Sequence, residues 1–371
     1  MRAIFSTPRA SWRNRAAAAL ALMLLLDACS PAPKALHKIT LAVGSQVLNS
    51  SYTYLVMPQA LGYWRQEGLD VDVVPVGGSQ QAIQQLVGGS ADFVEVNASS
   101  LIQSVATTGL PIRAIMANTT AADWALVSLA NGPVKSVRDF KGRTIGIATL
   151  GSGGAPMVKA YLRASGLDPD KDVTLQPTGS AGTALQALNS GRVDGLMYWG
   201  SALQTFEMAG AKLTYFRDPA WATYADFSVA TKDSTLKGDP ATAQALVRGM
   251  AKASAFFAAS PDCARKILWK AAPQLKASAG DEAAKTNFDT KMIELGARQV
   301  TSAKALGDGR QWAVAPQASY EAMQRFMIAN KVIDKAAAGA SLVETDPAFF
   351  QAANQFDTAQ VQQEAARCEG L

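Results

Sequence analysis

Hydroxyl, amide and indole side chains gather in segments that follow predicted strands. The segments are residues 45–53, 77–81, 95–100, 149–155, 178–183 and 198–201. In open α/β sheets, the segments beyond the carboxyl ends of the strands meet and bind ligands there. Serine hydroxyls, a close glycine backbone and the N–H groups at a helix start can together hold a small polar or anionic molecule. The chemistry that these residues predict is binding through neutral donors.

The sequence shows no catalytic or metal-binding set. Its single histidine, His37, precedes the first predicted strand, which leaves no Ser-His-Asp arrangement. Glu95, Asp123 and Asp226 lie at predicted cleft edges and could pair as acid and base, but each also fits a hydrogen-bonded structural carboxylate. Trp199 fits either a stacking surface for a flat ligand or a core residue. We therefore expect a protein that is not an enzyme and holds neither a metal ion nor a cofactor.

The elements that must position these residues contain an internal repeat. Residues 77–100 and 179–202 align when Asp92 is placed over Asp194. Each copy reads as a Gly/Ser loop, a short helix, a Gly-x-x-Asp turn and a buried strand, followed by small polar residues. A unit used twice predicts two similar α/β lobes that face each other across a cleft, although two helix–turn–strand units can also match by chance.

Strands and helices alternate along the chain, which predicts mostly parallel sheets covered by helices. Within this pattern, residues 54–67 read as one helix that ends at Gly68. The C-terminal third is helical in pattern and is too long to be a linker. The sequence therefore predicts two crossovers between a first lobe of residues 39–122 and 226–371 and a second lobe of residues 123–225.

The N-terminus has the pattern of an export signal. A basic start precedes an apolar run at residues 16–26, which is too short to span a bilayer. We predict that residues 1–28 are removed and that residues 29–38 form a tether. Residues 26–29, with the sequence LDAC, resemble the lipobox of bacterial lipoproteins, although Asp27 departs from it. That resemblance implies a lipid on Cys29 and a membrane-anchored periplasmic protein, whereas ordinary signal cleavage would leave a soluble periplasmic one.

Two further cysteines, Cys263 and Cys368, follow in the mature chain. An exported protein folds in an oxidising compartment, where an even number of cysteines indicates disulfides. We predict a disulfide between them that holds the C-terminal tail against the helix around Cys263. Two separate buried thiols are the alternative.

Several motifs together resemble the periplasmic substrate-binding proteins of ABC importers, in the nitrate/sulfonate/taurine-binding family. The motifs are GYW at residues 62–64 followed by EGL at 67–69, the turn at residues 139–142, and the doubled Gly-x-x-Asp. The resemblance implies a two-lobed periplasmic-binding-protein fold of type II, in which each lobe is a mostly parallel sheet with flanking helices. It also implies a monomer that closes on a small solute and delivers it to an inner-membrane ABC permease.

Carried onto this sequence, the resemblance predicts a set of ligand-binding residues in the cleft. They are Asn49, Ser50, Ser79, Asn97, Ser99, Ser152, Gly153, Gly154, Ser180, Trp199 and Asp226. The sequence departs from the family pattern at Gly200, where many relatives have proline. It also departs in having no lysine or arginine in these segments, so an anion would be held by neutral donors and helix starts.

The function that we expect is capture of a small sulfonate, taurine or nitrate-like solute for import. Trp199 together with Asp226 or Glu95 keeps a pyrimidine thiamine precursor, or another small aromatic molecule, as the alternative. An enzyme of the same fold and a sensor ectodomain are further alternatives, and the scarcity of titratable groups in the segments argues against the enzyme. Apart from the solute, the permease and the membrane, no partner is expected. The mature chain has no basic run that would bind nucleic acid.

Overall fold

The structure, a computed structural model, describes residues 35–370. The predicted signal segment, Cys29 and most of the predicted tether lie outside the described residues. The first strand, β1 (His37–Val43), begins two residues earlier than the tether prediction allowed. The backbone N–H of His37 donates a hydrogen bond of 2.8 Å to the carbonyl of Gly68, and this extends the pairing of β1 with its neighbour.

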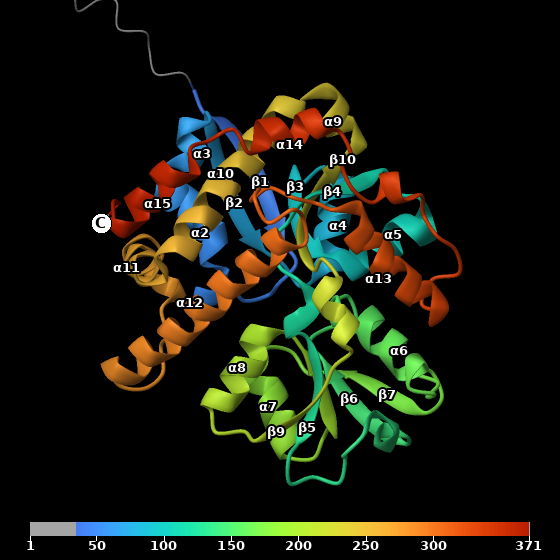
Figure 1. The fold of residues 1–371 in the computed structure, drawn as a ribbon. Helices are drawn as coiled ribbons and strands as arrows, with labels where there is room; N and C mark the ends of the chain where they lie inside the picture. The colour runs from blue at the N-terminus through green and yellow to red at the C-terminus, as the bar shows by residue number, and fades with distance from the viewer. Residues whose placement is uncertain (1–34, 371) are drawn as a thin grey trace, which may run out of the picture. The chain divides into compact units, whose positions relative to one another are not determined.

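In the part of the chain that the structure describes, ten strands form two five-stranded sheets (Figure 1). The first sheet has the order β2-β1-β3-β10-β4 and the second has the order β7-β6-β8-β5-β9. After β1, the strands are β2 (Leu69–Pro75), β3 (Phe93–Asn97), β4 (Ile112–Ala117), β5 (Ala125–Leu129), β6 (Arg143–Ile147), β7 (Val173–Pro177), β8 (Gly195–Tyr198), β9 (Leu213–Phe216) and β10 (Phe227–Lys232).

The two sheets share one plan. In the first, β1 pairs in parallel with β2 and β3, and β10 lies antiparallel between β3 and β4. In the second, β6 pairs in parallel with β7 and β8, and β5 lies antiparallel between β8 and β9. Each sheet is therefore mostly parallel with one antiparallel strand, and this confirms the predicted fold class.

The predicted repeat is reproduced element by element. Helix α4 (Ser79–Gly88) corresponds to α7 (Ala181–Asn189), and α5 (Ala98–Thr108) corresponds to α8 (Gly200–Met208). Strands β3 and β8 lie between these helices in the two copies, at the spacing that separates Asp92 from Asp194. Because the following helix begins at the same point in each copy, Asn97 and Trp199 occupy equivalent positions, each directly before a helix.

The helical C-terminal part packs onto the first sheet. Its helix α10 (Pro240–Ala259) contacts α2 (Thr53–Ala60), from the N-terminal part of the chain. It also contacts α15 (Thr358–Ala366), from the C-terminal part. The other helices are α3 (Tyr63–Gln66), α6 (Gly154–Ala164), α9 (Asp233–Gly238), α11 (Pro261–Ala271), α12 (Glu282–Ala305), α13 (Gln317–Ala329) and α14 (Pro347–Ala353). Short 3-10 turns are η2 (Ser50–Tyr52), η3 (Ala121–Asp123), η4 (Val137–Phe140), η5 (Pro219–Thr223), η6 (Pro273–Leu275) and η7 (Gly339–Ser341).

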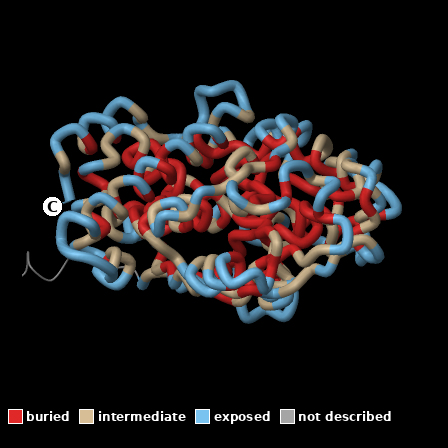
Figure 2. The backbone as a smooth tube through the Cα atoms, turned by 90° about the horizontal axis from the view of Figure 1, so that it is seen from below, coloured by how far each residue is buried: buried red, intermediate tan, exposed pale blue. Residues whose placement is uncertain are grey.

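The first sheet is buried on both faces. Leu41 and Val43 pack in the core shared with α10 and α11, whereas Ala42 between them packs in the core of the opposite face. Figure 2 shows buried stretches of chain running through the interior, with exposed stretches at the periphery. The predicted single helix at residues 54–67 is broken, since Gly62 adopts a left-handed conformation (φ +71°) between α2 and α3.

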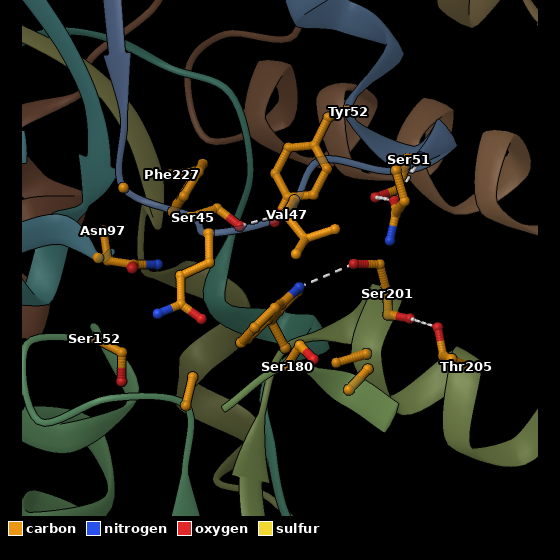
Figure 3. Close-up of a pocket in the computed structure, with 18 of the residues that line it drawn as sticks. Ser45, Val47, Ser51, Tyr52, Asn97, Ser152, Ser180, Ser201, Thr205 and Phe227 are labelled. Carbon is orange, nitrogen blue, oxygen red and sulfur yellow. Dashed lines mark hydrogen bonds between the residues drawn. The ribbon is translucent and has the colours of Figure 1, made fainter. Parts of the chain in front are cut away.

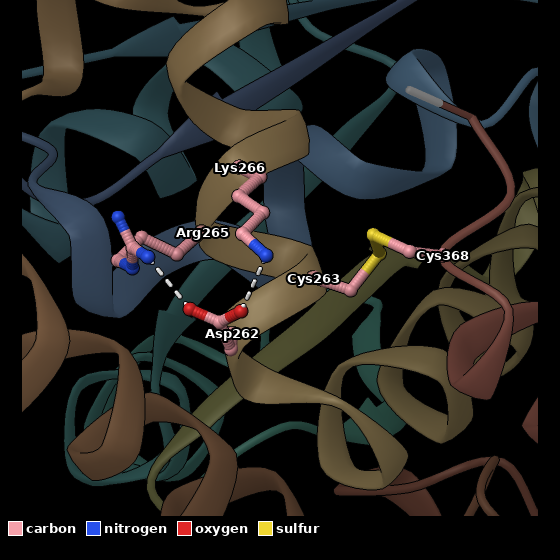
Figure 4. The surroundings of a disulfide bond; sticks show 5 residues. All are labelled: Asp262, Cys263, Arg265, Lys266 and Cys368. Carbon is pink, nitrogen blue, oxygen red and sulfur yellow. Dashed lines mark hydrogen bonds and ion pairs between the residues drawn. A yellow bond between two sulfur atoms is a disulfide. The ribbon is translucent and has the colours of Figure 1, made fainter.

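Two chain segments pass between the sheets, one after β4 and one after β9. They hold the turns η3 and η5, and they run side by side, joined by a bridge between Thr120 and Ala225. Cys263 on α11 and Cys368 beyond α15 form a disulfide that joins the C-terminal tail to α11 (Figure 4). Within residues 35–370, no helix is long and apolar enough to cross a membrane.

Candidate functional site

A cavity of about 320 Å³ lies between the carboxyl ends of the parallel strands of the two sheets. From the first sheet and the helices packed on it come Gly44, Ser45, Gln46, Val47, Asn49, Ser51, Tyr52, Tyr54, Gly77, Gly78, Asn97, Asp226, Phe227, Phe288 and Gln299. Thr119 and Trp124 come from the first crossing segment, and the second sheet supplies Ala148, Thr149, Ser152, Gly179, Ser180, Ala181, Gly182, Trp199, Ser201, Ala202 and Thr205. Figure 3 shows Asn97, Tyr52 and Phe227 on one side and Ser152, Ser180 and Ser201 on the other.

The structure divides the eleven ligand-binding residues predicted from sequence into two groups. The residues that line the cavity are Asn49, Asn97, Ser152, Ser180, Trp199 and Asp226. The residues that do not line it are Ser50, Ser79, Ser99, Gly153 and Gly154. Members of the second group lie behind the wall and hold members of the first group in place, or they hold one sheet against the other.

Asn97 ends β3 and projects its amide into the cavity (Figure 3). Its Oδ1 accepts a hydrogen bond of 2.9 Å from the hydroxyl of Ser79, and its Nδ2 donates one of 2.7 Å to Asp226. The Ser79 hydroxyl also accepts from the backbone N–H of Asn97 at 3.1 Å. These bonds fix the orientation of the amide at the cavity wall.

Asp226 is a buried carboxylate that joins the strand β10 to the first crossing segment. It accepts from Asn97 on one oxygen, and on the other from the indole Nε1 of Trp124, at 2.7 Å. Burial raises the pKa of Asp226 to about 6, while the hydrogen bonds from Asn97 and Trp124 oppose that rise. Asp226 therefore carries a negative charge at neutral pH and presents it to the cavity.

Glu95 lies two residues before Asn97 on β3 and is completely buried behind the cavity wall. It accepts hydrogen bonds from the Tyr54 hydroxyl at 3.1 Å and from Nδ2 of Asn118 at 2.8 Å. Burial is the main cause that raises the pKa of Glu95 to about 8, and Asp226 adds to the rise. Glu95 is therefore mostly protonated at neutral pH. Within the described part of the chain it forms no ion pair.

Among the described residues that line the cavity, Trp199 is the aromatic ring that the second sheet supplies. Trp199 precedes α8 and stacks on Tyr198, with ring centroids 5.2 Å apart and planes inclined by 23°. Its indole Nε1 donates to the Ser201 hydroxyl at 2.9 Å, and its ring lies 5.9 Å from that of Trp124. These contacts hold the Trp199 ring in its place in the cavity wall.

Ser50 and Gly154 illustrate why some predicted residues do not reach the cavity. The hydroxyl of Ser50 donates to the buried carboxylate of Asp289 on α12, and this bond ties the turn η2 to that helix. Gly154 starts α6 and lies against the ring of Trp124. Both residues support the wall from outside.

Several lining residues were not among those predicted from the sequence. Ser45 and Tyr52 lie in a segment that was singled out, and the N–H of Ser45 stays within its own turn by bonding to the carbonyl of Val43. Phe288 and Gln299 come from α12 in the helical C-terminal part, where no local pattern marks them. Only the packing of α12 beside η2 and α8 brings these two side chains to the site.

The chemistry of the lining is that of a binding site. Among residues 35–370, those that line the cavity include no lysine, arginine or histidine and a single carboxylate, that of Asp226. The lining combines hydroxyl and amide groups with indole, phenol and phenyl rings. The rings offer apolar area, and the few polar groups fix orientation, as in sites for small organic molecules.

Residues 49–264, more than half of the chain, match the family described as NMT1/THI5 like. The chain belongs to the NMT1/THI5-like family. One relative of this NMT1/THI5-like protein is the riboflavin-binding protein RibY of Chloroflexus aurantiacus, which is 29% identical over 188 residues. That match covers 44% of this chain and 51% of RibY, so the chain matches about half the length of that relative.

Solved structures place the NMT1/THI5-like chain among periplasmic binding proteins by fold. The ligand-binding component of an ABC-type import system from Staphylococcus aureus aligns with a TM-score of 0.62 at 12% identity, covering 86% of this chain and all (100%) of the other. The periplasmic aliphatic sulphonate-binding protein SsuA from Escherichia coli aligns with a TM-score of 0.55 at 14% identity, over 83% and 92% of the two chains. The desulfurization enzyme DSZB shares the fold as well, with a TM-score of 0.55 at 16% identity, over 85% and 98%.

Proposed function

We propose that this protein is the solute-binding component of an ABC importer, and that its solute is a small planar aromatic molecule without a negative charge. The observation that carries the proposal is the cavity lining. Trp199, Trp124 and Tyr52 supply ring surfaces, and Asp226 supplies a carboxylate that no lysine or arginine of the lining neutralises. A flat heterocycle with N–H groups suits both features, since the rings stack on it and the carboxylate accepts from it.

RibY supports this choice of solute class. Its name records riboflavin binding, and its amino-acid sequence is similar to that of this chain. Riboflavin and a pyrimidine thiamine precursor both combine a flat ring with hydrogen-bonding edges. Within the proposed site, Asn97 and Asp226 bind a polar edge of the ring, and Trp199 stacks on its face. Asn49, Ser152 and Ser180 contribute hydroxyl or amide contacts around it.

A sulfonate, taurine or nitrate-like solute is the second candidate, and one feature favours it. Ser180, Ala181 and Gly182 at the start of α7 line the cavity, as do Ser201 and Ala202 at the start of α8. Helix starts offer free N–H groups and a partial positive charge, which attract anions. Asp226 opposes this candidate, because a carboxylate ionised at neutral pH repels an anion in the same cavity.

Thermal unfolding with a panel of solutes separates the two candidates. The panel contains riboflavin, a hydroxymethyl-aminopyrimidine, taurine, an alkanesulfonate and nitrate. A bound solute at 100 times its Kd stabilises the folded protein by about 2.7 kcal/mol. We expect a rise in Tm with an aromatic member and none with the anions. A rise with taurine or an alkanesulfonate alone would contradict the aromatic assignment.

We further propose that the protein is not an enzyme. The shared fold of DSZB makes the direct test an incubation with biphenyl-2-sulfinic acid, the molecule bound in a DSZB structure. We expect no sulfite release from it. The scarcity of nucleophile and base pairs in the lining supports this expectation, and sulfite formation at a rate proportional to protein concentration would contradict it.

The proposed place of action is the periplasmic face of the inner membrane, with a lipid on Cys29 and an ABC permease as partner. Metabolic labelling with a radioactive fatty acid tests the anchor. We expect label in the intact chain and none in a Cys29→Ser variant. Absence of label from the intact chain, or its recovery from the soluble periplasm alone, would favour ordinary signal cleavage. Label in the Cys29→Ser variant would place the lipid at another residue.

A further inference from the structure

Gly153, at the start of α6, lies directly against Asn97. A methyl group built on Gly153 would overlap Cβ, Cγ and Oδ1 of Asn97. Glycine is not needed here for backbone reasons, because Gly153 has helical angles of −60° and −20°. Position 153 must lack a side chain only because the space between the two sheets is too narrow for one.

Further contacts surround this point and join the same two parts of the molecule. The hydroxyl of Ser99 donates a hydrogen bond of 3.1 Å to the carbonyl of Gly153. The backbone N–H of Gln80 donates to the carbonyl of Gly151 at 3.2 Å. The Thr149 hydroxyl donates to the carbonyl of Gly77 at 3.3 Å. The segment after β6 is thus held against the starts of α4 and α5 along a continuous line.

Asn97 cannot move aside to admit a side chain at position 153. Its Cβ belongs to the end of β3, and its amide is fixed by Ser79 and Asp226. A methyl group on Gly153 therefore has to push the segment after β6 away from β3, because a close-packed contact does not compress.

We propose that Gly153 sets the distance of closest approach between the two lobes, and thereby whether the cavity closes around a solute. Gly153 does not line the cavity, so it acts as a positioning residue through Asn97. Only the expected effect of Gly153 on solute affinity rests on the proposed solute-binding function. The approach of the two segments is a property of the protein without solute.

A disulfide trap measures this approach directly. A Cβ on Gly151 would lie 3.4 Å from Cβ of Gln80, close to the separation of about 3.5–4.5 Å found in disulfides. The double variant Gln80→Cys, Gly151→Cys should cross-link on mild oxidation without any solute. Adding Gly153→Ala should slow cross-linking at least tenfold. Adding Gly88→Ala should leave the rate unchanged, because nothing lies within 4 Å of a methyl group there.

Two results would overturn the proposal in this experiment. One is equal cross-linking rates with Gly153→Ala and with Gly88→Ala, and the other is no cross-link in the parent pair. If Gly153→Ala does not fold, Ser99→Ala replaces it, because that change removes only the bond to the Gly153 carbonyl. Ser99→Ala must then slow cross-linking, and an unchanged rate overturns the proposal.

Affinity supplies the second readout, with riboflavin as the probe. We expect Gly153→Ala to bind it at least tenfold more weakly than Gly88→Ala, with the same circular dichroism and a similar Tm. The apparent affinity falls because the closed form is populated less. Equal affinities would overturn the proposal. If the unaltered protein does not bind riboflavin, the aromatic assignment fails, and the cross-linking rates still decide the role of Gly153.

Discussion

Asp92 and Asp194 make the same hydrogen bond in the two lobes. The carboxylate of Asp92 accepts from the backbone N–H of Thr40 at 2.8 Å, and that of Asp194 accepts from the N–H of Thr144 at 3.0 Å. In return, the N–H of each aspartate donates to the carbonyl of the same threonine. Each pair of bonds fastens the turn before β3 or β8 to the adjacent parallel strand, so the two aspartates are structural.

Replacement of either aspartate should therefore affect stability and leave solute binding intact. We expect Asp92→Ala and Asp194→Ala each to lower the free energy of unfolding by about 0.5–1.5 kcal/mol. Asp194→Ala should lower the free energy of unfolding more than Asp92→Ala does, because the Asp194 carboxylate also forms an ion pair with Arg143 at 2.9 Å. Chemical unfolding measures the loss. A change in riboflavin affinity beyond twofold would show that these turns do more than hold the strands.

Asp226→Asn tests the carboxylate in the cavity. An asparagine can accept on one atom only, so one of the donors, Asn97 or Trp124, loses its partner. We expect a loss of about 1–3 kcal/mol in stability, the usual cost of an unsatisfied buried group. We also expect at least tenfold weaker binding of the aromatic solute, measured by titration calorimetry.

The matched control for Asp226→Asn is Asp123→Asn, which removes a nearby charge without touching either donor. Unchanged affinity in Asp226→Asn would contradict a contact between Asp226 and the solute. Tighter binding of a sulfonate by Asp226→Asn would instead support the anionic candidate, because the repelling charge is gone.

Trp199→Ala tests the stacking surface. Loss of the ring should weaken the binding of a flat solute by about one to two powers of ten, since aromatic contacts combine a large apolar area with preferred geometry. Trp199→Phe, which keeps a ring, should retain most of the affinity. Binding should also quench tryptophan fluorescence in the unaltered protein, because Trp124 and Trp199 both line the cavity. Equal affinities of the alanine and phenylalanine variants would exclude stacking on this residue.

Glu95 predicts a particular dependence of stability on pH. Its pKa is raised to about 8 in the folded protein and is near its ordinary value after unfolding, so the folded state binds the extra proton. Stability should therefore fall as the pH rises from about 4.5 to 8 and then level off. The limit is about 1.4 kcal/mol for each unit of pKa difference. Thermal unfolding at several pH values measures the slope.

Glu95→Gln is the control for this dependence, since it keeps the shape and removes the charge. The Oδ1 of Asn118, buried and without a partner, is able to accept from the new amide after the Asn118 side chain turns over. We expect Glu95→Gln to flatten the slope between pH 5.5 and 8.5 and to raise stability at the upper end. An equal slope in the variant would assign the dependence to other groups, with Asp226 the first to examine.

The disulfide should matter for stability and not for binding. Neither Cys263 nor Cys368 lines the cavity. The bond closes a loop between residues 105 positions apart. We expect the double variant Cys263→Ser, Cys368→Ser to lose about 2–4 kcal/mol and to keep its affinity for solute. Reduction of the unaltered protein with a mild thiol should reproduce the loss. A drop in affinity would show that α11 transmits strain to the cavity.

The sequence predicts the two-lobed fold because the repeat carries long-range information. Asp92 and Asp194 mark equivalent turns, and the strand after each turn leads directly to Asn97 or Trp199. Once the strand ends are known, the cavity side of both sheets follows from the parallel pairing. The prediction of a single helix at residues 54–67 was wrong, because the left-handed conformation of Gly62 breaks that helix. The pattern of apolar residues continues through the break and so does not reveal it.

The direction in which individual side chains point could not be predicted from the sequence. Ser79 and Ser99 sit at helix starts near the cavity, and each hydroxyl turns to a partner set by the packing of distant segments. Phe288 and Gln299 reach the cavity from α12, far along the chain, through contacts that no local spacing encodes. Local patterns thus place the frame of the site, and tertiary contacts select which side chains face inward.

The position of β10 between β3 and β4 has a consequence for the order of folding. The second sheet is built from one continuous stretch, β5 to β9, so its pairings are local and can form early during synthesis. The first sheet lacks its fourth strand until the chain has returned from the second, so β3 keeps an unpaired edge in the meantime. A nascent chain that stops between β9 and β10 should therefore expose an apolar strand edge, and such an edge invites pairing with another chain.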